Sequence, residues 1–600
     1  MSASAHSNTE QTELPRDKRG AFRLLSDYVV RDKPLLLRAL LLLLLATAAD
    51  VAGPILLKVF IDDHLLPENF ELRALLSLLL VYLLTQISAA WLRYQQTLRF
   101  CDMALGAVLD IRERVFAHVL RLPMVFYDRA MTGQLVSRIT NDTEAIKDLY
   151  VQFLSVVLTN LILLAGIIVA MGLLNVQLML IALTLVPAVV AVIYVYQRLS
   201  GTAVGQTRQL RSEINASISE SIAGMGVIQA SNQQQRFSAQ FEGLNSRYYR
   251  ARMRTVRAGA FLLRPAIDLL SVLVLVAVVW GFGLQQVAGV AEIGVLYAFL
   301  NYLSRFTEPL AEITQRFNLY QQAMVAGSRV HQLIQEGEQQ YPAGDALISA
   351  GAISVRQLDF QYQPGKPVLK TLSIEVPAGG FFAVVGHTGS GKSTLLNLLL
   401  NFYTPTGGEI RLDDQPLSQL GHEALRSGIG LIPQEPFVLA ASLYDNIDMG
   451  RDLGQAAIEK AARQAHLHSL IESMPLGYQT LLGERGTRLS TGQRQQLIIA
   501  RALAASPRIL LLDEATANVD SETEQVVQQA LSELHGKVTL IVVAHRLSTI
   551  RQADRILVLS HGEIAETGTH TELLARPDGL YGSMYRLQQQ ARRVEEAEGV

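Results

Sequence analysis

The sequence predicts two domains of different fold class: an all-α membrane domain of six transmembrane helices with long cytoplasmic extensions, and then an α/β P-loop domain. With 600 residues, the chain is too long for a single hydrophobic core. Half of the residues are hydrophobic and only 18% are charged, a composition that soluble globular proteins rarely show. The long apolar runs all lie before residue 325, whereas a strand, a glycine-rich loop and a helix follow one another from residue 381.

Six apolar stretches lie at the spacing of transmembrane helices, which favours membrane spans over buried core helices. Most approach the ~20 residues that an α-helix needs to cross ~30 Å of hydrocarbon. The sixth is the weakest, because Arg305, Glu308 and Glu312 interrupt it. The stretches are Leu35–Phe60, Leu75–Leu92, Leu154–Leu174, Leu178–Tyr196, Ala260–Leu284 and Val295–Leu319.

The charges of the connections predict the orientation. Arg73 is the only Arg or Lys in the short loops that join spans one and two, three and four, and five and six. The connections between spans two and three and between spans four and five are rich in arginine. The positive-inside rule therefore places both long connections and both termini in the cytoplasm. These connections contain few helix breakers, so we expect two long helices in each, extending the spans by ~30 Å, rather than inserted globular domains.

Composition also bears on partners and on the N-terminus. A net charge of −2 gives no indication of a nucleic-acid partner. Cys101 is the only cysteine, which excludes a disulfide framework and cysteine-based metal sites. The polar N-terminus holds no cleavable apolar segment, so we expect no signal peptide. Four apolar residues before the first span recur at helical spacing, namely Phe22, Leu25, Tyr28 and Val29. They predict either an amphipathic helix at the membrane surface or a plain soluble helix.

The second half of the chain contains a candidate phosphate-binding loop. Phe381–Val385 is typical of a buried strand, and Leu395–Leu400 of an apolar helix. The loop between them is Gly386, His387, Thr388, Gly389, Ser390, Gly391, Lys392, Ser393 and Thr394. Its glycines let backbone N–H groups surround phosphates, Lys392 reaches the β- and γ-phosphates, and Ser393 is suited to Mg²⁺.

Two further strands end in polar residues. Arg508–Leu512 is an apolar run followed by Asp513, a predicted Mg²⁺ ligand, and Glu514, which is placed to polarise an attacking water. Val538–Ala544 is followed by His545. A polar residue at this end of such a strand faces the nucleotide crevice, although an isolated histidine is more often structural.

The segment Leu489–Gln493, followed by Arg494, resembles the signature sequence of ABC transporters, and the resemblance extends over almost the whole chain. It implies bound ATP and Mg²⁺, with catalytic roles for Lys392, Glu514 and His545. It also implies that Ser490, Thr491, Gly492 and Gln493 cap the γ-phosphate held by the opposite subunit, so that one chain alone cannot complete an ATP site.

The resemblance assigns further residues. Tyr362 is similar to the aromatic residue that stacks on adenine, and Gln434 to the glutamine that senses Mg²⁺. Asp520 closes a segment similar to the D-loop, and Gly483–Gly486 resembles the segment that senses the partner's coupling loop. In the membrane half, three segments resemble the first intracellular loop, namely Phe126–Asp128, Thr132-Gly133 and Ser137–Asp142. Glu220 and Gly224, before Val227-Ile228, resemble the second loop, and each loop is expected to end in a short coupling helix.

The signature departs from its usual form at one position, because Thr491 replaces a glycine and restricts the backbone beside the phosphate. The nucleotide face of this chain looks competent, because it keeps Lys392, Asp513, Glu514 and His545. In the heterodimeric members of the family that the chain resembles, one composite site is often impaired and the other competent. We therefore expect a heterodimer whose active site uses Glu514 of this chain; a homodimer remains the alternative. The chain looks most like the B-type subunits of bacterial Mdl/Smd heterodimeric exporters. That likeness implies multidrug-type efflux across the bacterial inner membrane, with lipid or peptide export, or a nucleotide-gated channel, as alternatives.

The expected domain limits are 1–34 for a cytoplasmic N-terminus, 35–325 for the membrane domain, 326–350 for a linker, 351–585 for the ATPase domain and 586–600 for a polar tail. Polar residues within the spans have two interpretations, a substrate pathway or pairing between helices. Arg264 and Asp268 are spaced to pair on one helix face, whereas both interpretations remain open for Asp50 and Glu308.

Overall fold

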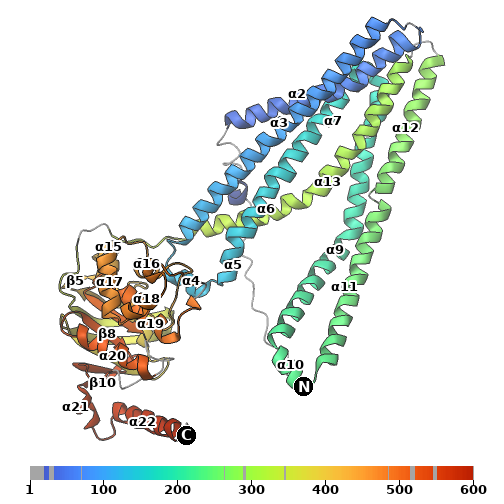
Figure 1. Cartoon of the computed structure of the whole chain (residues 1–600). Helices are drawn as coiled ribbons and strands as arrows, with labels where there is room; N and C mark the ends of the chain where they lie inside the picture. The colour runs from blue at the N-terminus through green and yellow to red at the C-terminus, as the bar shows by residue number, and fades with distance from the viewer. Residues whose placement is uncertain are drawn as a thin grey trace. The chain divides into compact units, whose positions relative to one another are not determined.

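A computed structural model describes residues 19–23, 25, 33–68, 70–262, 264–287, 292–342, 346–483, 486–513, 521–544 and 550–598, and the chain divides into two compact units. Unit 1 comprises Met1–Arg121 and Ala130–Glu336, and unit 2 comprises Leu122–Arg129 and Gly337–Val600. Unit 1 is helical and unit 2 is α/β, as the sequence predicts (Figure 1).

Unit 1 is built from long helices that match the six predicted spans. Their bounds are α2 (Lys33–Phe60), η1 (Ile61–Leu65), α3 (Leu72–Val119), α5 (Thr132–Ser137), η2 (Arg138–Asp142), α6 (Thr143–Asp148), η3 (Leu149–Leu154), α7 (Ser155–Leu174), α8 (Val176–Leu183), α9 (Leu185–Ala223), α10 (Met225–Ala230), α11 (Gln234–Leu262), α12 (Arg264–Val287) and α13 (Ile293–Gln335). By length and composition, five described helical stretches can cross a membrane: Lys33–Leu65, Leu72–Val119, Thr132–Leu174, Val176–Ala223 and Gln234–Gln285. The sixth, α13, carries the polar residues that we expected to weaken its signal.

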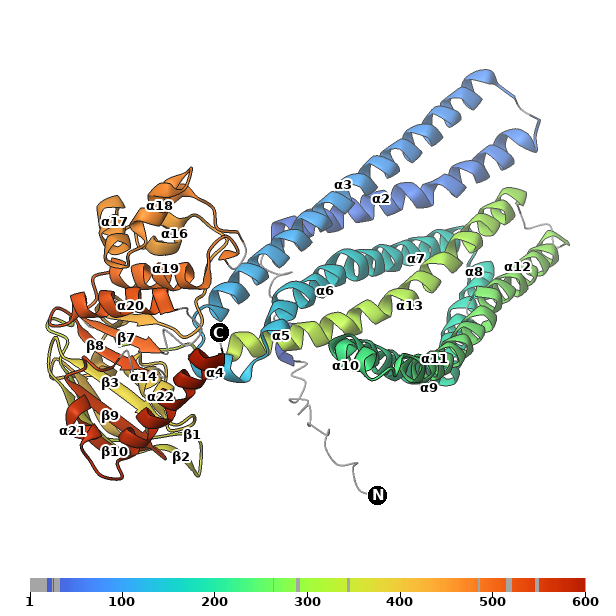
Figure 2. The same cartoon turned by 60° about the horizontal axis from the view of Figure 1, so that its bottom comes forward.

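Helix lengths confirm that the helices extend well beyond the length of a membrane span. The 48 residues of α3 rise about 72 Å at 1.5 Å per residue, more than twice the ~30 Å of hydrocarbon. The α9 and α11 helices lie side by side and leave the rest of unit 1, and α10 joins them at the tip (Figures 1 and 2). Between α7 and α8 the helix is interrupted because Asn175 is extended and its side chain accepts the N–H groups of Gln177 and Leu178.

The apolar core of unit 1 is formed by α13 together with α7, α8, α9 and α12. Phe299, Tyr302 and Phe306 of α13 are almost fully buried in it. The described part of the N-terminal helix packs onto the same unit, because Ala21 and Leu25 are buried and the Tyr150 hydroxyl donates to the Leu25 carbonyl (2.8 Å). Tyr28 and Val29 lie outside the described residues.

Unit 2 combines a six-stranded sheet, in the order β10-β9-β3-β8-β7-β6, with a four-stranded antiparallel sheet in the order β2-β1-β4-β5. The strands from β9 to β6 are parallel, and β10 is an antiparallel edge. Strand bounds are β1 (Ile353–Gln363), β2 (Lys366–Val376), β3 (Phe381–Gly386), β4 (Gly407–Leu412), β5 (Gln415–Pro416), β6 (Ile429–Ile432), β7 (Ile509–Asp513), β8 (Thr539–Val543), β9 (Arg555–Ser560) and β10 (Glu563–Gly568).

Some helices of unit 2 cover the parallel sheet. Others, from α16 to α19, pack against one another. The described helices of unit 2 are α4 (Met124–Arg129), α14 (Lys392–Leu399), η4 (Leu417–Gln419), α15 (His422–Gly428), α16 (Leu443–Asp448), α17 (Gln455–Gln464), α18 (His468–Ser473), η5 (Gly477–Gln479), α19 (Thr491–Ala504), α20 (Ser521–Leu534), α21 (His570–Leu574) and α22 (Leu580–Glu598). The sheet is buried on both faces, which explains its uninterrupted apolar strands. Successive residues of β3 point to opposite cores: Phe381 and Ala383 to one, Phe382 and Val384 to the other.

Two element ends differ from the expected domain limits. The α13 helix continues to Gln335, so the first ten residues of the expected linker, 326–335, are helical and belong to unit 1. The α22 helix runs to Glu598 and covers most of the expected polar tail.

Candidate nucleotide-binding site

The phosphate-binding loop has the predicted strand–loop–helix setting. It begins at the end of β3, whose six residues are all buried between β8 and β9, and it ends in α14. Gly391 caps α14 with φ +103°, a conformation that disfavours any side chain. A Cβ at Gly386 would meet the Leu559 carbonyl and the Ser390 hydroxyl, the latter at 2.6 Å. The two glycines therefore allow the backbone to turn tightly, so that its N–H groups can donate to phosphate oxygens.

Two buried polar side chains line this loop. Lys392 is 6% exposed, and its Nζ donates to the carbonyls of Gly386 (2.9 Å) and His387 (3.1 Å). The Ser390 hydroxyl is buried and has no hydrogen-bond partner among the described residues. His387, Thr388 and Gly389 form the exposed rim. A cation folded against its own loop and an unsatisfied hydroxyl both fit a site that binds phosphate oxygens.

Ser393 and Asp513 come together as the sequence predicts. The Ser393 hydroxyl donates to Oδ1 of Asp513 across 3.2 Å, because β7 ends beside the start of α14. A hydroxyl and a carboxylate are hard oxygen ligands of the kind that Mg²⁺ prefers. The donor set therefore fits the expected metal ion.

Gln434, the third expected Mg²⁺ ligand, follows β6 by two residues and is exposed. Since β6 pairs in parallel with β7, Gln434 and Asp513 leave the same edge of the sheet. The geometry puts Gln434 near this edge, and its coordination of a metal stays a prediction.

Tyr362 lies beside the phosphate-binding loop. Its hydroxyl donates to Oγ1 of the buried Thr394 across 3.2 Å, and its ring meets the edges of Phe360 and Tyr403. The residue is 40% exposed, so part of the ring faces solvent. This placement is compatible with the stacking on adenine that the sequence suggests.

Several expected site residues lie outside the described residues. They are Glu484, Arg485, Glu514, Asp520 and His545. The strands that precede Glu514 and His545 are described, and β7 and β8 are neighbours in the sheet. The chain leaves both strands at the edge that holds the phosphate-binding loop.

The signature residues begin α19. Ser490 is its N-cap, and a capping box forms because Ser490 accepts the N–H of Gln493 while the Gln493 side chain accepts that of Ser490. Thr491 is exposed and its hydroxyl accepts Nη2 of Arg494 at 3.2 Å, whereas Gly492 is buried. No hydrogen bond or ion pair in the described part of the chain joins residues 490–493 to residues 386–391.

An arginine that the sequence analysis missed connects the segment after Gln434 to α19. Arg501 donates to the carbonyls of Asn446 (2.7 Å) and Phe437 (2.8 Å) and to Oδ1 of Asn446 (2.9 Å). Burial, and then the neighbouring charge of Arg451, lower the pKa of Arg501 to about 10, so it stays protonated at neutral pH. The one available signal was an arginine within an otherwise apolar stretch of α19, residues 497–504.

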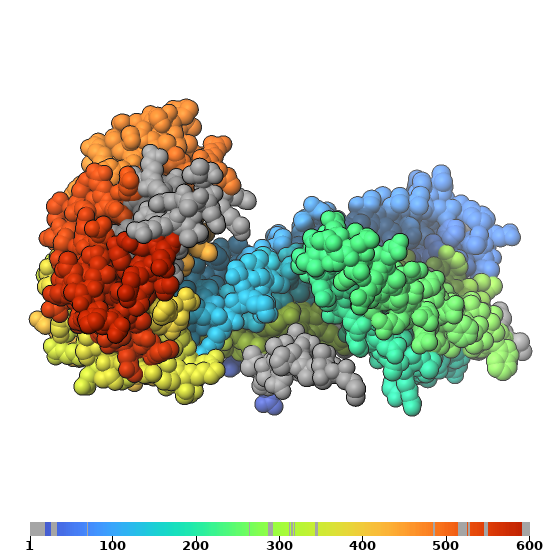
Figure 3. Space-filling model, turned by 90° about the horizontal axis from the view of Figure 1, so that it is seen from below, coloured from blue at the N-terminus to red at the C-terminus, as the bar shows by residue number. Residues whose placement is uncertain are grey.

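The two predicted coupling helices are both present as six-residue helices. The α4 helix, with Phe126 and Tyr127, groups with unit 2, and Val125 packs against its core. The α10 helix stands at the tip of α9 and α11, the green end of unit 1 in Figure 3. Ile222 and Val227 at this tip are 67% and 72% exposed.

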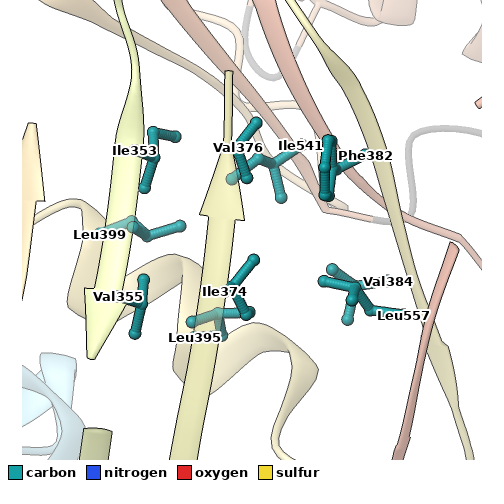
Figure 4. Close-up of a pocket in the computed structure, with 10 residues that line it drawn as sticks. All are labelled: Ile353, Val355, Ile374, Val376, Phe382, Val384, Leu395, Leu399, Ile541 and Leu557. Atoms are coloured by element: carbon teal, nitrogen blue, oxygen red, sulfur yellow. The ribbon is translucent and has the colours of Figure 1, made fainter. Parts of the chain in front are cut away.

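A small cavity beneath the phosphate-binding helix is not a second site. Its volume is about 10 Å³, and Figure 4 shows its lining side chains coming from both sheets and from α14. The lining is Ile353, Val355, Ile374, Val376, Phe382, Val384, Leu395, Leu399, Ile541 and Leu557. A cavity of this size without polar groups is a dry packing gap.

Comparison with known proteins is consistent with this geometry. The family model for the ABC transporter transmembrane region matches residues 36–310, and the family model described as ABC transporter matches residues 369–517. The chain is 40% identical to "Multidrug resistance-like ATP-binding protein MdlB" of Buchnera aphidicola subsp. Schizaphis graminum, over 94% of this chain and 97% of that protein. It is 34% identical to "Fatty acid ABC transporter ATP-binding/permease protein" of Mycobacterium bovis, over 80% and 76% of the two chains. A bacterial Atm1-family ABC exporter with ATP bound superposes with a TM-score of 0.75 at 28% identity, covering 93% of this chain and 98% of that one.

Proposed function

Because the chain belongs to the ABC transporter family and couples ATP hydrolysis to transport across a membrane, we propose that it exports small amphipathic compounds as one half of a heterodimer. The position of the signature residues supports an ATP site that is shared between two chains. Ser490–Gln493 bond within α19, and residues 386–391 receive no hydrogen bond from them in the described part of the chain. A second half-transporter therefore supplies the signature that faces this chain's nucleotide.

In the proposed ATP site, residues of the phosphate-binding loop and of the two neighbouring strand ends bind the phosphates and orient the attacking water. Backbone N–H groups of residues 386–392 surround the phosphates, and Lys392 turns from its own carbonyls to the β- and γ-phosphate oxygens. Ser393 and Asp513 would hold Mg²⁺, which would neutralise phosphate charge when bound. Glu514 orients the attacking water, and His545 contacts the γ-phosphate.

Movement reaches the membrane through the short helices α4 and α10. Val125 already packs on the core of unit 2, so α4 moves with the ATPase domain of its own chain. The exposed apolar residues at the tip of α9 and α11 fit a contact with the ATPase domain of the other chain. Closure of the two ATPase domains on ATP then opens the membrane pathway outward, and hydrolysis resets it.

Thr491 supports a non-identical partner. Its side chain is exposed at the N-terminus of α19, and its hydroxyl is held by Arg494. It adds bulk where a glycine would leave room for the partner's γ-phosphate. This chain's own P-loop, Asp513 and Glu514 are intact, so the altered signature serves the other composite site.

The substrate class rests on the relatives' names. A 40% identical relative is called multidrug resistance-like and a 34% identical one is called a fatty acid transporter. We favour multidrug-type efflux across the bacterial inner membrane, with export of lipid or fatty acid as the second candidate.

Expression of the chain alone and beside candidate partner half-transporters tests this proposal. We expect ATPase activity stimulated by amphipathic compounds from a co-purified pair in liposomes. Full activity from a pure homodimer would contradict the heterodimer, and stimulation by fatty acids alone would replace the substrate class.

A further inference from the structure

One face of α13 is polar although the helix crosses the bundle core. Asn301, Ser304, Arg305 and Glu308 recur at helical spacing, and the last three are exposed. The opposite face is almost fully buried through Phe299, Tyr302 and Phe306, which are at most 3% exposed. We call these four polar residues the α13 polar stripe.

The α13 polar stripe lies at membrane depth. The Tyr302 hydroxyl donates to the Val51 carbonyl (2.5 Å) and Arg305 Nη1 to the Asp50 carbonyl (3.3 Å). Asp50 stands near the middle of the apolar stretch Lys33–Leu65. Glu308 is three residues further along α13, about 4.5 Å along the axis.

A charged stripe at this depth cannot face lipid cheaply. An ionised side chain at the centre of a bilayer costs at least ~2.5–3.5 kcal/mol, so such groups face a cavity or a partner. Because Arg305 and Glu308 are both exposed on one side of unit 1, the stripe borders a water-filled pathway or the second half-transporter.

Glu308 differs from the other acids at this depth. Asp50 forms an ion pair with Arg93. Glu312 accepts Nδ2 of Asn160 at 3.0 Å and lies 3.7 Å from Arg316. Glu308 has no hydrogen bond or ion pair within the described residues, so its carboxylate is available to a ligand.

We propose that Glu308 binds the cationic group of amphipathic substrates, so that this half-transporter selects lipophilic cations over lipophilic anions of the same size. This assignment rests on the proposed export function and adds a substrate charge to it. The charge of a carboxylate at reduced dielectric discriminates strongly between ligands of opposite sign. The apolar body of the ligand then remains among the hydrophobic surfaces of the membrane helices.

The test uses two probes of equal shape and opposite charge, tetraphenylphosphonium and tetraphenylborate. The full-length transporter is reconstituted in liposomes, and ATPase activity is measured against the concentration of each probe. Glu308→Gln is expected to raise the half-maximal tetraphenylphosphonium concentration at least tenfold and to leave that of tetraphenylborate within twofold. Glu308→Asp restores most of the cation response.

Glu113→Gln is the matched control, because Glu113 is an exposed carboxylate on the cytoplasmic part of α3. It should keep both wild-type values. Equal shifts for both probes in Glu308→Gln, an unchanged cation response, or loss of the dimer on size exclusion would each overturn the assignment; the last would make Glu308 a partner contact. If no amphipathic probe stimulates the wild type, the proposed export function itself fails, and the assignment falls with it.

Discussion

Replacing Arg501 with glutamine tests whether the network behind the signature helix holds the ATPase domain together. The guanidinium joins α19 to the segment after Gln434 through Phe437 and to α16 through Asn446. Asn446 is fully buried, and its amide also bonds Leu439 and Ser442. Every polar atom of the Asn446 side chain is therefore satisfied, and part of that satisfaction comes from Arg501.

The magnitude follows from the two bonds to the buried asparagine. A hydrogen bond to a charged group contributes about 1.5–3 kcal/mol, and a buried acceptor left without its donor adds to the loss. The bond to Phe437 is more exposed and contributes less. We expect Arg501→Gln to destabilise the ATPase domain by about 3–5 kcal/mol, which corresponds to a fall in its Tm of roughly 6–20 °C.

Differential scanning calorimetry of the purified full-length chain, with and without ATP, measures this effect through the unfolding transition of the ATPase domain. Arg463→Gln is the matched control, because Arg463 makes an exposed pair with Glu459 four residues away on α17 and should change Tm by no more than about 1 °C. If Arg501→Gln unfolds within 2 °C of the wild type, the network contributes little and this reasoning is wrong.

Two smaller predictions follow from local contacts. Four backbone N–H groups, from Ser349 to Ala352, bond the carboxylate of Asp413; burial alone would raise its pKa, but these donors outweigh burial and lower it. A carboxyl group whose pKa is lower in the folded state stabilises the fold at neutral pH, and this stabilisation is lost as the pH falls below the pKa of the unfolded state. Asp413→Asn should therefore lower the free energy of unfolding by about 1–2 kcal/mol at pH 7, as measured by chemical unfolding. The difference in this free energy between the variant and the wild type should shrink below about pH 4. In unit 1, Asp62 accepts the Gly294 N–H at the start of α13 and lies 3.3 Å from Lys58, and a Cβ at Gly294 would clash with its carboxylate. Gly294→Ala should therefore lower Tm in the wild type but leave it unchanged, or raise it, in an Asp62→Ala background; equal losses in both would exclude this clash as the cause.

Local patterns predicted most of the fold and the phosphate side of the site. The apolar run of β3 and the glycines after it specify a strand and a turn within a few residues, so the loop and Lys392 were identifiable from the sequence alone. Asp513 was identifiable for the same reason, because it directly follows an apolar strand.

Features that depend on distant packing were not predictable. The end of α13 was not evident from the sequence because the apolar signal stops before the helix does, and the helix continues to Gln335. The grouping of α4 with unit 2 depends on Val125 reaching a core more than two hundred residues away in sequence. Arg501 is similar, because its acceptors, Asn446 and Phe437, are 55 and 64 residues distant.

The most direct test of the account is ATP-driven export by a Glu514→Gln variant in sealed liposomes. We expect this variant, assembled with its partner, to bind ATP with close to wild-type affinity while ATP hydrolysis and accumulation of an amphipathic cation both fall at least a hundredfold. Export at the wild-type rate with this substitution would contradict the claim that this chain's own nucleotide site drives transport.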